Sequence, residues 1–135
     1  MTRVMITGGR GYTNQARVYQ ILDAAIVRLE MTELIVGDCP TGLDALGKKW
    51  ARERGFAFRE FKANWDDLTA PGARIKKRRD GSEYNANAGP DRNRAMVVQG
   101  KPHHGLAFEG GDGTRDAVRH LRAAGIEPHF IDWNG

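Results

Sequence analysis

The amino-acid sequence predicts an α/β protein, a three-layer sandwich in which helices cover both faces of a mostly parallel five-stranded sheet. Two observations predict this class. Short apolar runs alternate with segments of helical periodicity along the whole chain, which is the order of elements that builds parallel sheets. The 135 residues also suffice for one domain that buries its own core. We therefore expect a single domain over residues 1–135.

Five strands are expected, and each is a short run of apolar or alternating residues. The runs are Arg3–Thr7, Leu34–Val36, Phe56–Phe61, Gly105–Phe108 and Pro128–Ile131. Right-handed crossovers place the carboxyl ends of parallel strands along one edge of the sheet. We expect the ligand at that edge, where the strand order reverses.

The first two helices follow the first two strands. Apolar residues at spacings of three and four predict a helix over Asn14–Glu30. Thr41 and Asp44 have the spacing of a capping box, with Asp in place of Glu, and indicate the start of the second helix. That helix is expected to end near Gly55, because glycine favours helix termini.

Two further helices are expected in the second half of the chain. Pro90 suits a first helical turn and predicts a helix that continues to about Gln99. The last helix is expected over Thr114–Ala124, since threonine is favoured at the N-cap and Gly125 provides a stop.

The segment between the third strand and the third helix, roughly Lys62–Gly89, is expected to be a long irregular loop. Ordered loops of this length are uncommon and are usually functional. The segment contains a basic cluster, Arg74–Arg79, in which every residue except Ile75 is cationic. We interpret the cluster as a solvated loop, with a nucleic-acid patch as the alternative.

Composition excludes several classes of protein. The chain is 40% hydrophobic and 28% charged, as expected for a folded globular protein rather than a disordered one. No apolar run approaches the ~18–20 residues of a membrane span, and the N-terminal segment lacks the features of a signal peptide. One cysteine and four histidines exclude the usual structural zinc site. We expect a reducing, cytoplasmic setting, no membrane partner, and neither a metal nor another cofactor.

The charge balance favours an anionic partner. The formal net charge is +4, and a cationic excess suits a nucleotide or a nucleic acid.

Three strand-to-helix turns are rich in glycine, namely Gly8–Gly11, Gly37–Gly42 and Gly110–Thr114. Glycine lets backbone amides approach a ligand, and a helix N-terminus adds unpaired N–H groups and the positive end of a dipole. Three such turns at one sheet edge predict a phosphate-binding cradle. The ATPase P-loop motif is absent, and the dinucleotide fingerprint fails because Asn14 stands at its third glycine.

Motifs along nearly the whole chain resemble the SLOG superfamily. They are Gly8-Gly9-Arg10, Gly42-Leu43-Asp44 with Trp50-Ala51, Ala63-Asn64-Trp65, Ala88–Met96 and Phe108–Thr114. More narrowly, they are similar to its small stand-alone branch, which is related to the YspA proteins of bacteria and phages. The resemblance is weakest over Arg74–Asn87, which looks like an insertion. It implies a Rossmann-like sheet that binds a nucleotide-derived ligand.

The enzymes among these relatives, the LOG-type phosphoribohydrolases, cut the N-glycosidic bond of a nucleoside 5′-monophosphate. Other relatives sense NAD-derived signals or bind single-stranded DNA. Arg92–Met96 resembles the LOG motif Arg-Lys-Ala-x-Met, which implies that Arg92 has the position of the catalytic arginine. In the second LOG motif, Glu109 replaces the proline and Ala117 stands at the catalytic glutamate.

The acids left at the expected edge are Asp38, Asp44, Glu109, Asp112 and Asp116. Asp116 precedes the LOG glutamate position by one residue, so a helix turns its side chain by ~100° from the direction of residue 117.

We identify Arg92 and Asp44 as the candidate catalytic residues. Asp44 either complements the dipole of the second helix or contacts the ribose, and Trp65 either packs in the core or stacks on a base. The expected ligand-binding residues are Gly8, Gly9, Arg10, Gly37, Thr41, Gly42, Trp65, Arg92, Asn93, Gly110, Gly111, Gly113 and Thr114.

Three functions stay open. The chain binds a nucleotide or an NAD- or ADP-ribose-derived molecule as a sensor or sequestering module, or it is an N-glycosidase acting on a nucleoside 5′-phosphate. A weaker alternative is single-stranded nucleic-acid binding through Arg74–Arg79 with Trp65 stacking. Arg92 favours catalysis and Ala117 favours binding alone. A homodimer or a higher homo-oligomer is compatible with the sequence.

Overall fold

Five parallel strands form the central sheet in the computed structural model, which describes residues 1–133. The strands are β1 (Arg3–Thr7), β2 (Glu33–Gly37), β3 (Phe58–Phe61), β6 (His104–Phe108) and β7 (His129–Ile131), in the order β3-β2-β1-β6-β7. Every neighbouring pair is parallel. The predicted α/β class and the five-stranded sheet are therefore confirmed.

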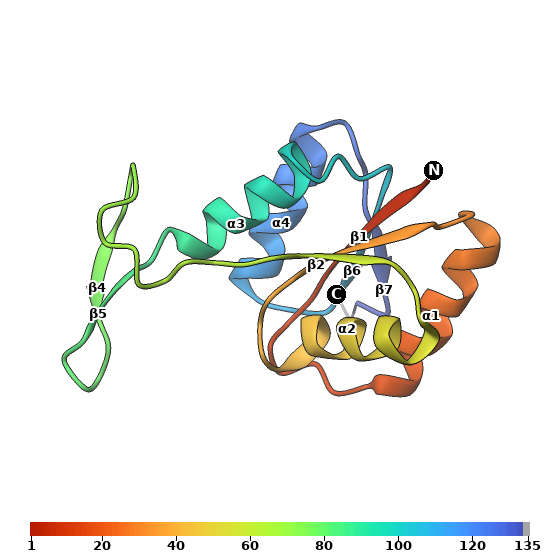
Figure 1. Cartoon of the computed structure of the whole chain (residues 1–135), viewed down its shortest axis with the longest axis horizontal. Coiled ribbons are helices and arrows are strands. Elements are labelled where there is room, and N and C mark those ends of the chain that lie inside the picture. The colour runs from red at the N-terminus through yellow and green to blue at the C-terminus, as the bar shows by residue number, and fades with distance from the viewer. Residues whose placement is uncertain (134–135) are drawn as a thin grey trace.

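Four helices cover the two faces of this sheet (Figure 1). Helices α1 (Gln15–Arg28) and α2 (Gly42–Arg54) pack on one face, and α3 (Ala88–Val98) and α4 (Asp112–Ala123) pack on the other. The side chains of β1 alternate between the two cores, because successive residues of a strand point to opposite faces. Val4 and Ile6 join the core under α1 and α2, whereas Met5 joins the core under α3 and α4. Across residues 1–133, no helix combines the length and the apolar character needed to span a membrane.

The helix ends show which local signals operate. The Asn14 side chain accepts a hydrogen bond from the Arg17 N–H (3.1 Å) and caps α1. Gly55 ends α2 in the left-handed conformation, with φ of 60°. The Phe56 N–H then donates to the Ala51 carbonyl (2.8 Å), so the residues after Gly55 complete the helix end. The third strand accordingly begins at Phe58 and not at Phe56.

The details of two helix starts differ from expectation, at α2 and at α4. The capping box at Thr41 and Asp44 does not form, because the Thr41 hydroxyl donates to the Arg10 carbonyl (2.9 Å) instead of capping its own helix. Helix α4 begins at Asp112 with Gly111 at the N-cap, so Thr114 lies within the first turn and is not the N-cap. Helix α3 begins at Ala88, so Pro90 lies in its first turn, as expected.

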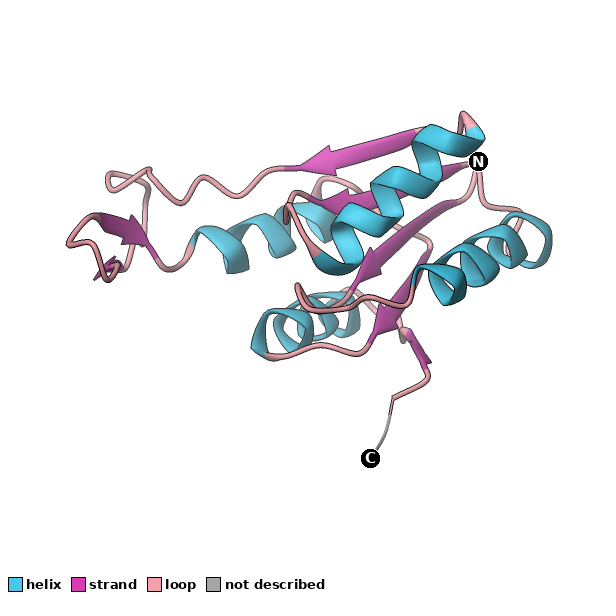
Figure 2. Cartoon of the chain, turned by 90° about the horizontal axis from the view of Figure 1, so that it is seen from below, coloured by secondary structure: helices cyan, strands magenta, loops and turns pink. Residues whose placement is uncertain are grey.

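Residues 62–89 are not irregular throughout, which corrects the expectation for this segment. They contain an antiparallel hairpin of β4 (Ile75–Lys77) and β5 (Glu83–Asn85). Figure 2 shows the hairpin beyond the carboxyl ends of the sheet strands, next to the start of α3. Each strand has three residues and little burial, too short a run for a periodic pattern to be recognised.

Leu22→Ala in α1 should lower the free energy of unfolding by about 2–5 kcal/mol, because it leaves a cavity under a fully buried side chain. Val27→Ala in the same helix is the matched control. Its side chain is 77% exposed, so its loss should change stability by no more than about 0.5 kcal/mol. Urea denaturation of both variants measures the difference, and equal losses would contradict the assignment of the α1 core face.

Candidate functional site

A cavity of about 310 Å³ opens where β1 and β6 end. The strand order reverses at these two strands, which is where open parallel sheets bind ligands. We call it the glycine-turn cavity. Its lining includes Thr7 at the end of β1 with Gly8–Arg10 after it, Gly37 at the end of β2, Cys39 and Asp44 around the start of α2, Arg92 and Asn93 of α3, and Gly111–Thr114 at the start of α4.

The N-terminus of α4 contributes backbone donors to this cavity. Its first helical hydrogen bond runs from the Arg115 N–H to the Gly111 carbonyl (3.0 Å). The N–H groups of the three preceding residues, Asp112–Thr114, therefore have no carbonyl partner within the helix. All three residues line the cavity. The positive end of the helix dipole is also there, so this wall favours an anion.

The first and second glycine turns hold each other in place. The Leu43 N–H donates to the Gly9 carbonyl (3.1 Å), and the Thr41 hydroxyl bonds to Arg10 as described above. Gly42 has φ of +71°, and a Cβ there would overlap the Gly9 carbonyl oxygen. Thr41 and Gly42 thus support the first turn from behind and are not among the residues that line the cavity.

The third turn packs against the first turn in the same way. The Gly9 N–H donates to the Glu109 carbonyl (3.0 Å), which removes it from the donors available to a ligand. A Cβ on Gly110 would come within 2.6 Å of the Gly9 nitrogen and would overlap the Thr114 hydroxyl. Gly110 is therefore a packing glycine next to the cavity wall.

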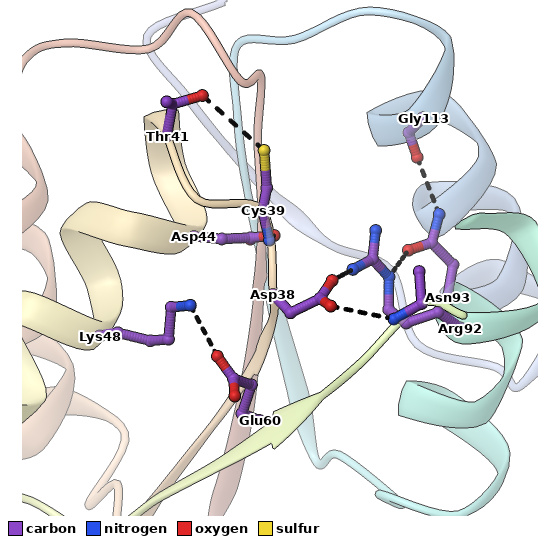
Figure 3. A network of polar contacts seen from close by, with 10 residues as sticks. Asp38, Cys39, Thr41, Asp44, Lys48, Glu60, Arg92, Asn93 and Gly113 are labelled. Carbon is purple, nitrogen blue, oxygen red and sulfur yellow. Dashed lines mark hydrogen bonds and ion pairs between the residues drawn. The ribbon is translucent and has the colours of Figure 1, made fainter. Parts of the chain in front are cut away.

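Arg92 is held by a chain of polar contacts beside the glycine-turn cavity (Figure 3). Its Nη1 forms an ion pair with Asp38 Oδ1 at 2.8 Å, and its Nε donates to Asn93 Oδ1 at 2.9 Å. Asn93 Nδ2 in turn donates to the Gly113 carbonyl and to Asp116 Oδ2, each at 3.1 Å. These bonds orient the guanidinium at the cavity and connect α3 to α4. The pairing of Asp38 with Arg92 was not foreseen from the sequence, although Asp38 follows β2 directly.

Asp44 presents a buried carboxyl group to the same cavity. The residue is 9% exposed, and burial raises the pKa of its carboxyl group above the usual aspartate range, against the opposing effect of Arg92 and of the Cys39 N–H that donates to it (3.2 Å). Among residues 1–133, no basic side chain lies within ion-pair distance of it. Lys48, one turn further along α2, forms its ion pair with Glu60 instead, with 2.6 Å between Nζ and Oε2 (Figure 3).

Gly37 allows Asp44 and Arg92 to approach each other. A Cβ at this position would lie 2.6 Å from Asp44 Oδ2 and 2.7 Å from Arg92 Nη1. Because neither group could stay where it is beside an alanine, the glycine at the end of β2 determines the spacing of the two candidate catalytic residues.

Ala117 faces away from the cavity. It is fully buried and packs in the core under α3 and α4 with Met5, Ile35 and Met96. Asp116, one residue earlier, turns toward Asn93 and also pairs with Arg119 (3.2 Å). Its carboxylate is satisfied by these neighbours and is not part of the cavity lining. Residues 1–133 contain no group of three or more histidine, cysteine, aspartate or glutamate side chains suited to a metal ion.

A second cavity, of about 740 Å³, lies between the hairpin and the first cavity. We call it the hairpin cavity. Trp65 lines this second cavity rather than the first, as do the cations of β4 and the following turn, Lys76–Arg78. Arg10, Cys39 and Arg92 line both cavities, so the two spaces adjoin. The basic cluster is exposed, as expected of a solvated segment, but three of its residues also form a cavity wall.

The sheet order and the position of the cavity define a Rossmann-like α/β protein with a site at its topological switch point. Residues 2–67 match the model of the YAcAr family, described as the YspA, cpYpsA-related SLOG family. This match supports membership of the SLOG superfamily, in its YspA-related branch. This membership indicates a nucleotide-related ligand in general terms. No curated protein matches the chain.

The raised pKa of Asp44 predicts a pH-dependent difference between the protein and its Asp44→Asn variant. The folded state favours the neutral carboxyl, so its stabilising contribution is complete below about pH 4 and is lost as the pH rises through the higher folded-state pKa. The variant is neutral throughout and retains an acceptor for the Cys39 N–H. Its melting temperature relative to the parent should therefore increase between pH 4 and pH 7. A constant difference over that range would contradict burial of an ionisable carboxyl.

Proposed function

We propose that the chain binds the phosphate and ribose of a nucleotide, or of an NAD- or ADP-ribose-derived molecule, in the glycine-turn cavity, and acts as a sensor or sequestering module. The observation that supports this most directly is the convergence of helix N-terminal amides and an oriented arginine on one cavity at the switch point. Both groups recognise phosphate, the amides through the helix dipole and the arginine through its charged donors.

The roles of the individual residues follow from their chemistry. The N–H groups of Asp112–Thr114 donate to phosphate oxygens, and the side chains of Arg10 and Arg92 neutralise the phosphate charge. The carboxyl of Asp44, from α2, lines the same cavity, and it accepts hydrogen bonds from ribose hydroxyls. The backbone of Gly8 forms the floor between them.

Calorimetry with AMP and adenosine tests the phosphate-binding role. AMP should bind and should raise the melting temperature, whereas adenosine should bind at least about tenfold more weakly, because it lacks the charge-assisted hydrogen bonds. Arg92→Met should weaken AMP binding by a similar factor and leave the affinity for adenosine within threefold. Arg94→Met, in the same helix but exposed, is the matched control. Equal affinities for nucleoside and nucleotide would reject the proposal.

A second candidate function is hydrolysis of the N-glycosidic bond of a nucleoside 5′-phosphate. The observation that favours it is a buried carboxyl, Asp44, next to Arg92 in the cavity. In this reaction water adds to C1′ of the ribose, and the base departs with a proton. Asp44 stabilises the positive charge that develops on the ribosyl centre while Arg92 holds the phosphate. The absence of an acid at position 117 argues for weak turnover.

Product analysis with AMP separates the two carboxylates. We expect little or no release of adenine by the parent protein. Any hydrolysis should be abolished by Asp44→Asn and retained by Asp116→Asn, because Asp116 is engaged by Asn93 outside the cavity lining. Robust turnover that survives Asp44→Asn and is lost in Asp116→Asn would reverse the assignment.

A further inference from the structure

The hairpin cavity has a cationic wall with unneutralised charge. In the β4–β5 ladder Lys76 pairs with Tyr84, so Lys76, Tyr84 and Arg78 belong to the same face of the hairpin. The Arg78 guanidinium is already engaged, 5.1 Å from the Tyr84 ring centroid and 3.3 Å from Asp66. Lys76 and Lys77 have no ion-pair partner within 4 Å among residues 1–133. The charge of Lys76 is available to an anion on the face that carries Tyr84, whereas Lys77 lies across from Glu83 and belongs to the opposite face of the hairpin.

The same cavity has an aromatic wall that is fixed in position. The rings of Trp65 and Tyr84 lie 6.3 Å apart, at an interplanar angle of 59°. The Trp65 carbonyl accepts the Asn85 N–H of β5 (2.7 Å). On the other side, a Cβ at Gly89 would lie 2.8 Å from Trp65 Cη2, so the indole packs directly on the start of α3. A planar ring that enters this cavity meets an aromatic surface held between the hairpin and α3.

The two cavities form one extended site. Arg10 and Arg92, which line both, lie where a ligand would pass from one to the other. Each cavity by itself is within the ~300–1,000 Å³ typical of a small-molecule site. The cations of the hairpin line a single bounded cavity, as a compact polyanion requires. A nucleic-acid strand is instead tracked by an extended basic groove.

We propose that the hairpin cavity binds the second half of a small dinucleotide-like ligand whose first phosphate and ribose occupy the glycine-turn cavity. Arg10 and Arg92 contact the phosphates at the junction, Lys76 binds a further phosphate or sugar hydroxyls, and a ring of the second half stacks on Trp65. This inference rests on the proposed function and adds to it the class of ligand, a nucleotide extended by a second phosphate-bearing unit.

Calorimetry with AMP and ADP-ribose tests the extension. The parent protein should bind ADP-ribose at least about tenfold more tightly than AMP, because the second phosphate gains charge-assisted contacts. The double variant Lys76→Ser with Lys77→Ser should lose most of this preference and keep its affinity for AMP within threefold. The double variant Arg28→Ser with Arg94→Ser removes the same charge at exposed positions outside both cavities, and should behave like the parent.

Tryptophan fluorescence tests the proposed stacking on Trp65 separately. NAD⁺, whose nicotinamide provides the ring of the second half, should quench the tryptophan fluorescence of the parent more strongly than AMP does, and Trp65→Leu should remove this difference. Equal affinity for AMP and ADP-ribose would overturn the inference while the proposed function stands, whereas binding of neither would overturn both. A contrary result would be that the parent binds a twenty-nucleotide oligo(dT) more tightly than ADP-ribose and loses that binding in the double lysine variant. That result would overturn the inference and identify single-stranded nucleic acid as the ligand of the hairpin cavity.

Discussion

The close approach of three backbone turns at the carboxyl ends of β1 and β6 is the constraint on which the site depends. The Gly9 carbonyl accepts N–H groups from Tyr12 and Leu43, and the Gly9 N–H donates to the Glu109 carbonyl. Side chains at Gly42 or Gly110 would overlap this turn. Because the turns are joined through backbone atoms, the helix N-termini that follow them have fixed positions relative to the sheet edge.

The charged side chains around the glycine-turn cavity orient one another more than they stabilise the fold. The ion pair between Arg92 and Asp38 is mostly buried, with 14% and 23% of the two side chains exposed. The desolvation of such a pair offsets much of its attraction, so its clearest effect is to aim the guanidinium. Asp44 is buried without a comparable partner. The glycine-turn cavity therefore has an oriented cation beside a carboxyl that has no ion-pair partner among residues 1–133, and the proposed recognition of a phosphorylated sugar depends on these two groups.

Individual residues show which structural features could be predicted from the sequence and which could not. The signals that succeed are local: the apolar periodicity of α1, glycine at the end of α2, and short apolar runs for the strands. The capping box at Thr41 fails because the Thr41 hydroxyl donates a hydrogen bond to the Arg10 carbonyl, 31 positions away, and nothing in the local sequence signals this contact. The hairpin escapes notice because three-residue strands lack a period, and cross-strand contacts such as Arg78 over Tyr84 hold it together.

The sequence by itself determined the α/β class, the order of the five sheet strands and four helices along the chain, and the three glycine-rich turns, because these are properties of neighbouring residues. Only the tertiary structure decided which groups meet. It paired Arg92 with Asp38, 54 positions away, turned Ala117 into the core, and brought the basic hairpin to the wall of a second cavity. Such contacts depend on how the sheet and helices pack, and no local pattern in the chain encodes the distance between residues that the fold brings together.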